Sequence, residues 1–594
     1  MNNGHRVRVM VVCFLLVCAF TVFSWRLVDL QVVRNAEYLA KAMEKNVVCV
    51  PIHSRRGVIQ DVHGEPLAQN EPMKMVVADG SLIQKHEELA QVLAPLLGLP
   101  VNGLLEKLKS TRLPKGESVR VPLRYIVLKK KVPESVVAEI TSQLVARKLK
   151  GLRFEPDTER VYPNGRMLCH VVGYVNSEGA GMDGVERTLD RFLAGRDGFR
   201  YIERDRTGRE LVPYRGHERA PLDGQNVRLT IDMGLQQIVE SELEAAARHF
   251  KPKMAIAILM RPQTGEILAL SNWPNYDPNQ IEGSPEAARR NRALTDMVEP
   301  GSTFKIVTTA AALQQRLVSP ATMIYCEGGR FSYGGQVLHD HHPYADLSVE
   351  DILVKSSNIG VAKLGLQLGD QTLYEYVRRF GFGERTGLNL PGEIPGVVHP
   401  PHRWSKVSIT HVPMGHEVGA TPLQVVTAMA AIANGGRLMM PQIVREVVDS
   451  HGTVTQAFEP VEVRRVVSPQ VTEAVRDALV QVVSKRGTAA LAKVSGFRVA
   501  GKTGTAQKIG ANGKYEHKYV VSFVGYMPAE QPEFVGLVML DEAQTASNQN
   551  YGGLVAAPIF SRIGEKAARY LNLVPTAEDP DLGVLASRGE KGRD

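Results

Sequence analysis

The sequence predicts an α+β protein in three parts: one apolar helix, then an elongated mixed α/β module, then a larger unit with a helix-covered antiparallel sheet. Three observations support this prediction. A run of 17 residues without charge lies between Arg8 and Arg26. Short extended runs then alternate with helical patterns as far as residue 226. Beyond that point, apolar runs typical of strands stand at both ends of a long helical middle, 291–491.

Size and charge limit the function classes. The chain has 594 residues, of which 44% are hydrophobic, so it is globular and too long for a single core. Its net charge is +8, from 71 basic and 63 acidic residues, and the charges are spread along the sequence. This distribution argues against nucleic-acid binding and fits contact with anionic membrane or cell-wall surfaces.

The charge-free run, "VMVVCFLLVCAFTVFSW", would span roughly 25 Å as a helix, enough for a bilayer core. Basic residues precede it and no acidic residue does. We therefore expect a cytoplasmic N-terminus, 1–8, a transmembrane anchor, 9–27, and the remainder outside the cytoplasm.

The five cysteines bear on processing and on disulfides. A cleaved signal peptide and a lipoprotein signal ending at Cys18 are alternatives to the anchor. No small-x-small site follows the run, and Val17 is a poor residue before a lipidated cysteine, so we predict an uncleaved anchor. Outside the anchor, Cys49, Cys169 and Cys326 are widely separated, which permits at most one disulfide.

The mixed module, 28–226, contains two glycine-punctuated segments, "RRGVIQDVHGEPLA" and "GAGMDGVERTLDRFLAGRDG". We interpret them as turns and clasps whose paired arginine and glutamate residues tie one lobe to another.

The larger unit, 227–573, begins with a helix pattern in which Asp232 is a plausible cap. "MAIAILMRPQTGEILALSN" predicts a hairpin, and "GFRVAGKTGTAQ", "YVVSFVGYMP" and "EFVGLVML" predict three more strands before a last helix. The polar tail, 574–594, is predicted to be disordered.

The stretch "VEPGSTFKIVTTAAAL" carries a candidate nucleophile. It predicts a helix after Pro300-Gly301, with Ser302 at or near the cap and Lys305 one turn on. A serine hydroxyl needs a base, and Lys305 can serve only when uncharged. Lowering its pKa from about 10.4 to about 7 costs on the order of 4 to 5 kcal/mol. Burial, the helix N-terminus and a second cation, Lys502, would share that cost.

Two further motifs supply partners for this pair. In "KSSNIGVAKL", Ser356 could relay a proton to a leaving group and Asn358 could bind a substrate amide. In "AGKTGTAQ", Thr503 could bind a carboxylate, and the small Gly501 and Gly504 would let a substrate backbone approach a strand edge. Each motif is weak alone, but each occurs once and in this order.

Together the three motifs resemble the signatures of penicillin-binding proteins and serine β-lactamases. They are Ser302-x-x-Lys305, Ser356-x-Asn358 and Lys502-Thr503-Gly504. "RRGVIQDVHGEPLA", "ERVYP", "GMDGVE", "TIDMGLQ" and "GFGERTGLNLPGE" further resemble class B penicillin-binding proteins, which are single-anchor peptidoglycan D,D-transpeptidases. The resemblance covers most of the chain and implies a pedestal of the dimerisation type, 28–226, and a transpeptidase domain, 227–573.

The resemblance implies a two-step acyl transfer without metal or cofactor. Ser302 would attack the penultimate D-Ala carbonyl of a pentapeptide stem with Lys305 as base, and D-Ala would leave after protonation through Ser356. The N–H groups of Ser302 and Thr505 would form the oxyanion hole. A neighbouring amine would then take the acyl group. The residues implied to hold the substrate are Asn358, Lys502, Thr503, Gly504 and Thr505.

The resemblance also implies the partners: stem peptides, lipid-linked precursor strands, β-lactams, a multispan membrane glycosyltransferase and division proteins. β-Lactams are expected to acylate Ser302 and stay bound. Related hydrolases carry a glutamate ahead of a Leu-Asn pair. Here Glu384 precedes Leu388-Asn389 at a spacing one residue longer, which disfavours a hydrolase.

Within the class, "NRALTDMVEPGSTFK" and "ERDRTGRE" resemble the septal, division-type branch. This resemblance implies a location in the cytoplasmic (inner) membrane, with a periplasmic catalytic domain. One departure is "PMGHEVGATPLQ", where division-type relatives usually carry an aromatic, glycine-rich loop. The alternatives are an elongation-type or other specialised class B transpeptidase, a non-catalytic scaffold, and a β-lactam sensor. A sensor would need several membrane spans or a signalling domain, and a degenerate scaffold would be expected to lose Lys305 or Ser356.

Two histidine-rich segments have competing interpretations. "LHDHHPY", with His339 to His342 and Cys326 upstream, could suggest zinc, but adjacent residues seldom face one point, so we interpret it as a polar loop near the active-site mouth. His411, His416 and Glu417 could suggest a Ser-His-acid triad. A serine–lysine scheme needs no histidine, so we interpret them as loop packing.

Overall fold

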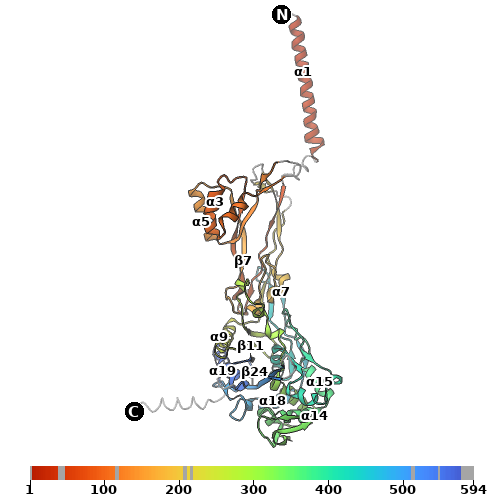
Figure 1. Ribbon diagram of the computed structural model, residues 1–594. Helices are drawn as coiled ribbons and strands as arrows, with labels where there is room; N and C mark the ends of the chain where they lie inside the picture. Colours follow the sequence, from red (N-terminus) through yellow and green to blue (C-terminus); the bar gives the residue numbers. More distant parts are fainter. Residues whose placement is uncertain are drawn as a thin grey trace, which may run out of the picture. The chain divides into compact units, whose positions relative to one another are not determined.

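The computed structural model describes residues 3–35, 37, 47–113, 119–204, 210–213, 218–509, 515–545 and 549–576. They form two compact units, shown in Figure 1. The first comprises Met1–Arg55, Glu71–Glu159 and Gly195–Gly224, and the second Arg56–Asn70, Arg160–Ala194 and Gln225–Asp594. Two segments of the predicted pedestal, 56–70 and 160–194, thus pack with the C-terminal part of the chain. Of the predicted disordered tail, 577–594 lies outside the described residues.

The N-terminal helix α1 spans Asn3–Val28, and a π-helical turn, Asp29–Val33, follows. Among the described residues, Val7–Val33 is the one helix long and apolar enough to cross a membrane. Its large apolar side chains are exposed, as a lipid-facing helix requires. With one such helix in its described part, the chain is a single-pass membrane protein.

The rest of the first unit is a small mixed domain. The helices α3, α4 and α5 bury leucine and isoleucine side chains in a separate core with the neighbouring strands. The elements of this domain are α3 (His86–Leu97), α4 (Val101–Leu108), α5 (Glu134–Ala146), β4 (Thr111–Arg112), β5 (Val121–Pro122), β6 (Ile126–Val132) and β7 (Leu152–Val161). A second sheet in this unit has the order β1-β8-β9, with bounds Val47–Ile52, Gly198–Arg204 and Glu210–Pro213.

The second unit is built on a five-stranded antiparallel sheet with the order β12-β11-β25-β24-β23. The strands are β11 (Met254–Met260), β12 (Ile267–Trp273), β23 (Ala500–Ile509), β24 (Tyr515–Met527) and β25 (Phe534–Asp541). Every residue of β11 and β25 is buried, because helices cover both faces of the sheet. The predicted α+β class is confirmed, and so are the hairpin and the three later strands. β23 lies at the edge.

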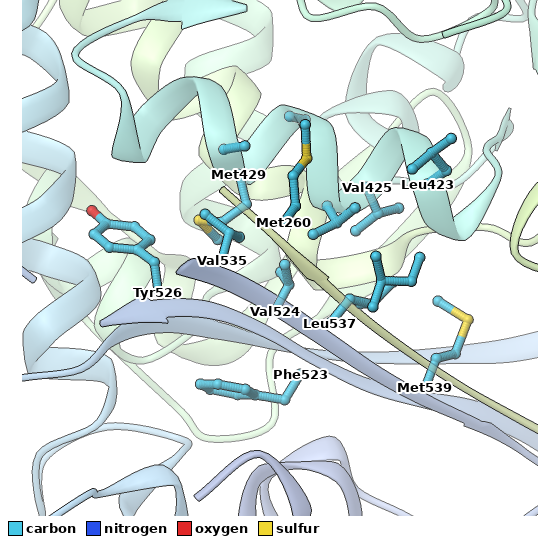
Figure 2. Close-up of a cluster of buried hydrophobic side chains, with 14 of the residues drawn as sticks. Met260, Leu423, Val425, Met429, Phe523, Val524, Tyr526, Val535, Leu537 and Met539 are labelled. Carbon is cyan, nitrogen blue, oxygen red and sulfur yellow. The ribbon is translucent and has the colours of Figure 1, made fainter. Parts of the chain in front are cut away.

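Side chains of the sheet alternate between two helical layers. On one face Phe523 packs against Phe560 of α19 (Gly552–Tyr570), with ring centroids 4.8 Å apart. On the other face Val524 points toward α17 (Pro422–Ala433), as Figure 2 shows. α9 (Met233–Phe250) lies on the α19 face. Asp232 caps α9 by accepting hydrogen bonds from Gly234 N and Leu235 N, as predicted.

The predicted helical middle consists of helices interspersed with short pairs of antiparallel strands. The short helix α10 (Glu286–Arg289) precedes it, and its α-helices are α11 (Arg292–Thr295), α12 (Lys305–Gln314), α13 (Val349–Val354), α14 (Asn358–Leu368), α15 (Asp370–Arg379), α16 (Ser408–His411), α17 and α18 (Pro469–Val482). The paired strands are β13 (Met323–Tyr325) with β16 (Asp346–Ser348), β14 (Arg330–Tyr333) with β15 (Gln336–His339), β17 (Val397–Val398) with β18 (Val418–Gly419), and β19 (Arg437–Met439) with β22 (Glu462–Arg465).

A buried ion cluster, here called the arginine clasp, joins two segments of the second unit, 56–70 and 160–194. Glu186 is fully buried. Its carboxylate lies 2.7 Å from the Nε of Arg56 and 2.7 Å from the Nε of Arg160. The sequence predicted that such pairs tie one lobe to another. The arginine–glutamate pairs are confirmed, but they do not join two separate units, because all three residues belong to the second one.

A second sheet of this unit lies beside the clasp segments, with β10 (Asn226–Leu229) parallel to β2 (Ile59–Gln60) and antiparallel to β20 (Val444–Val448), which pairs with β21 (Val454–Ala457). β3 (Pro66–Ala78) pairs with β2 through its first residues. Cys169 and Cys326 are free and buried, and the side chain of Cys49 lies outside those described.

Candidate active site

The candidate nucleophile lies in a tight turn that leads into α12. Gly301–Phe304 forms one turn of 3-10 helix, η3, and α12 begins at Lys305. The sequence predicts Ser302 at or near the cap of an α-helix. The α-helix begins three residues later, and neither helix start carries a side-chain cap hydrogen bond. The half-buried Ser302 hydroxyl is thus not used as a cap.

Two glycines allow β23 to pack against neighbouring parts of the chain. A Cβ at Gly504 would lie 2.3 Å from Ser522 Oγ and 3.0 Å from Thr303 Cγ2. A Cβ at Gly501 would lie 2.3 Å from the ring of Phe523. The expectation that these glycines admit a substrate backbone stays a prediction, and the structure adds a packing role for both. They make room for the chain's own side chains, and the Gly504 position lets β23 approach η3.

Residues from all three sequence motifs meet at the hydroxyl of Ser356. Its Oγ lies 2.9 Å from Lys502 Nζ and 3.2 Å from Lys305 Nζ. Lys305 Nζ also donates to the carbonyl of Ser356, at 2.6 Å, and to Asn358 Oδ1, at 2.7 Å. Ser356 has a left-handed φ of 58°, a conformation rare outside glycine that clusters at functional sites. The structure thus joins Lys305, Ser356, Asn358 and Lys502.

Both lysines, here called the lysine pair, are fully buried. Burial lowers the pKa of Lys305 to about 7, and the charge of Asp340 opposes the shift. Burial, and then the positive charge of Lys305, hold the pKa of Lys502 well below its ordinary value. Lys502 and the helix N-terminus were expected to lower the pKa of Lys305 as well. In the structure burial is the cause, and the mutual repulsion disfavours two charges at once.

Asp340 holds the start of α14 in place, a role that the sequence motifs did not indicate. Its carboxylate accepts hydrogen bonds from Ser357 Oγ, at 2.6 Å, from Ile359 N, at 3.1 Å, and from Asn358 N. A negative charge is favoured at this N-terminus of α14. His339 O accepts from Asn358 Nδ2 at 3.0 Å. The histidine-rich loop therefore orients Asn358, and among the described residues no group of three or more His, Cys, Asp or Glu could hold a metal ion.

Threonine hydroxyls continue the site along β23. Thr503 Oγ1 lies 2.9 Å from Thr488 Oγ1, a residue that no sequence motif marked. Thr505 Oγ1 accepts a 3.3 Å hydrogen bond from Gly552 N, at the start of α19. These hydroxyls and the Lys502 ammonium group follow one edge strand, an arrangement suited to a carboxylate.

The residues considered for other chemistry are engaged elsewhere. Glu417 pairs with His411 at 3.0 Å, and His416 pairs with Glu299 at 2.9 Å. Among the described hydrogen bonds, none joins either histidine to Ser302. Glu384 forms ion pairs with Arg378 and Arg464, at 2.7 and 2.9 Å.

Comparison with known proteins identifies both parts of the chain. Residues 255–565 match the penicillin binding protein transpeptidase domain, and residues 51–229 match the penicillin-binding protein dimerisation domain. The chain is 32% identical over 593 residues to the peptidoglycan D,D-transpeptidase FtsI of Escherichia coli K12, covering 98% of this chain and 95% of the relative. It is also 32% identical over 586 residues to the stage V sporulation protein D of Bacillus subtilis, covering 97% and 87%.

Among solved structures, penicillin binding protein 3 of Mycobacterium tuberculosis in complex with aztreonam superimposes with a TM-score of 0.68 at 27% identity. The match covers 89% of this chain and all of that chain.

Proposed function

The chain belongs to the penicillin-binding proteins with a transpeptidase domain, and from this premise we propose that it is a peptidoglycan D,D-transpeptidase that crosslinks stem peptides through an acyl-enzyme on Ser302. One observation carries the proposal for the site: two fully buried lysines from separate motifs bond to the same Ser356 hydroxyl. Buried, mutually repelling ammonium groups cost free energy that a purely structural site would avoid.

The geometry supports Lys305 as the general base. An uncharged Lys305 has two N–H groups, which match its two strongest acceptors, Ser356 O and Asn358 Oδ1, and one lone pair. When Ser302 Oγ attacks the carbonyl carbon of the D-Ala-D-Ala bond, this lone pair takes the hydroxyl proton. The C–N bond then breaks, and the proton moves from Lys305 through Ser356 Oγ to the leaving nitrogen. D-Ala departs as the amine.

A substrate carboxylate would decide which lysine is charged. Placed beside Lys502 and the hydroxyls of Thr503 and Thr505, it would raise the pKa of Lys502 and favour its charged form. The ammonium group of Lys502 would then disfavour protonation of Lys305. In this way the bound substrate would itself keep the base uncharged.

The remaining steps use the same groups. The N–H groups of Ser302 and Thr505 form the oxyanion hole, in which each donor contributes about 3 to 4 kcal/mol. An amine of a neighbouring stem peptide then attacks the ester carbonyl, Lys305 takes a proton from the attacking nitrogen, and the C–O bond breaks to regenerate Ser302. β-Lactams acylate Ser302 by the same attack, with opening of the lactam C–N bond.

We further propose a role in septal cell-wall synthesis. The catalytic unit would lie on the outer side of the cytoplasmic membrane, and the partners would be a multispan glycosyltransferase and division proteins. The division-type relative supports this role. The sporulation protein, equally identical, supports a second candidate, a specialised class B transpeptidase. Depletion separates them: filamentation supports the septal role, rounding an elongation role, and normal vegetative growth a specialised one.

The nucleophile is tested by labelling membranes with a fluorescent penicillin. Ser302→Ala should abolish the labelled band, and Ser319→Ala, an exposed serine of the same unit, should leave it intact. Persistent labelling of Ser302→Ala would show that another residue is acylated.

A further inference from the structure

The segment that leads into Ser302 is held along its length by one loop. Val298 N donates to Ala420 O at 2.9 Å, and Ala420 N donates to Val298 O at 2.8 Å. Gly301 N donates to Gly415 O at 3.3 Å. The loop residues between these two contacts therefore lie directly beside Glu299, three residues before the nucleophile.

The Glu299 carboxylate connects this segment with two other parts of the unit. Its Oε1 accepts a 2.9 Å hydrogen bond from Glu417 N, and its Oε2 lies 2.9 Å from His416 Nδ1. The Tyr515 hydroxyl, from the start of β24, donates to the same Oε2 at 3.4 Å. The rings of His416 and Tyr515 meet edge to face, with centroids 5.8 Å apart.

Glu417 occupies a conformation that favours glycine. Its φ is 59°, in the left-handed region, where a residue other than glycine costs of order 1 kcal/mol or more. The side chain is nevertheless fixed, because Oε2 accepts a 2.6 Å hydrogen bond from Ser408 Oγ and Oε1 lies 3.0 Å from His411 Nδ1. His416 and Glu417 both lie in the loop segment "PMGHEVGATPLQ", 413–424, and His411 ends the preceding helix α16.

The two oxyanion donors explain why such fixation matters. The N–H of Ser302 comes from η3, and the N–H of Thr505 comes from β23, so their spacing depends on how two elements pack. β23 continues into the hairpin whose second strand begins with Tyr515. Glu299 therefore contacts the second strand of the hairpin that carries one donor and lies in the segment that leads to the other. A misplacement of about 1 Å can cost 10²-fold in rate.

We propose that Glu299, His416 and Glu417 form a positioning cluster that keeps the Ser302 turn in register with β23, and that Glu299 is its central residue. The inference rests on the proposed acyl transfer. In this role Glu299 contacts neither the substrate nor the reacting atoms, and it acts only through the backbone of Ser302. Its loss should therefore lower the rate of acylation and leave the affinity of the non-covalent complex unchanged.

The test measures both constants on the detergent-solubilised full-length protein. Stopped-flow acylation by a fluorescent penicillin gives the limiting rate, k2, and the dissociation constant of the preceding complex, K. For Glu299→Gln we expect k2 to fall about 10- to 100-fold and K to stay within about twofold. His63→Gln is the matched control, because it removes another histidine–carboxylate pair of the same unit, with Asp232 at 3.2 Å, and should change neither constant.

Two substitutions of His416 distinguish the effect of its hydrogen bond to Glu299 from the effect of its packing. Asn can place an N–H group near the Nδ1 position, so His416→Asn should retain k2 within about threefold. His416→Leu removes the donor and should lower k2 about tenfold. Thermal unfolding checks that each variant is folded, and if Glu299→Gln does not fold, the Asn and Leu variants decide the matter.

Three results would overturn the inference: an unchanged k2 in folded Glu299→Gln, a raised K with an unchanged k2, which indicates a ligand-binding carboxylate, or equal k2 values for the Asn and Leu variants. Failure of the proposed function looks different, because the wild-type protein itself would then not be acylated.

Discussion

The lysine pair and the arginine clasp are two arrangements of the same kind, each with two buried cations around one central group. In the clasp the centre is a carboxylate, Glu186, 2.7 Å from each guanidinium group. In the active site the centre is a neutral hydroxyl, Ser356 Oγ, with the lysines at 2.9 and 3.2 Å. The central group and the cation type together decide what each cluster can do.

Arginine stays protonated in proteins, whereas buried lysine loses its proton readily. The clasp therefore keeps its charges and joins the segments 56–70 and 160–194. The lysine pair has no carboxylate of its own at the centre, and burial lowers the pKa of Lys305 to about 7. We expect changes to the lysine pair to alter catalysis with little effect on stability, and changes to the clasp to do the reverse.

The largest effect is expected for Lys305→Met, which removes the base but keeps a side chain of similar length. Acylation by a fluorescent penicillin should slow by about 10²- to 10⁴-fold. The free energy of unfolding should stay level or rise, because replacing a buried cation with an apolar side chain is often neutral or stabilising. A strongly destabilised Lys305→Met would mean that the lysine pair is structural, as the clasp is.

Glu186→Gln should have the opposite signature. It leaves the buried guanidinium group of Arg160 without its carboxylate partner, whereas Arg56 keeps an ion pair with Asp190 at 2.7 Å. Breaking a buried ion pair costs about 3 to 5 kcal/mol of unfolding free energy. Chemical denaturation measures this loss, and the folded fraction should acylate at the wild-type rate. Glu384→Gln is the control, because that carboxylate also lies between two arginines but is 37% exposed, so its loss should cost less than about 1 kcal/mol.

The pH dependence of acylation tests the protonation of the lysine pair directly. Only uncharged Lys305 accepts a proton, so the second-order rate should rise with pH through a value of about 7. Below that value we expect about a tenfold change per pH unit, and above it a plateau. A rate that is flat between pH 5.5 and 8.5 would contradict Lys305 as the titrating base.

The smallest effect is expected for Glu417→Gly. This residue lies outside the lysine pair and outside the arginine clasp, so it shows how a change elsewhere in the unit compares with changes in either cluster. Relief of the left-handed strain, about 1 kcal/mol, offsets the loss of the side-chain hydrogen bonds to Ser408 and His411, about 1 kcal/mol each. The unfolding free energy should therefore change by about 1 kcal/mol or less, while k2 falls about threefold. A k2 equal to that of the wild type would separate Glu417 from the positioning cluster.

Local patterns in the sequence located much of the site. Ser302 and Lys305 are three residues apart at a helix start, and Ser356 and Asn358 are two apart, so each pair is visible in a short window. Asp340 was not recognised, because its partners at Asn358 and Ile359 lie 18 and 19 residues away. The contact between Glu299 and His416 spans 117 residues, and no periodicity or spacing marks it.

The order and composition of the chain by themselves determined the apolar anchor helix, the α+β class, the strands of the central sheet and the three motifs, because these depend on neighbouring residues and on hydrophobic periodicity. Only the tertiary structure decided that both lysines are buried at one hydroxyl, that Gly501 and Gly504 make room for side chains of the same unit, and that the arginine clasp lies within a single unit. The physical reason is that burial and long-range contact set the charge of a lysine and the partner of a side chain, and neither is a property of the local sequence.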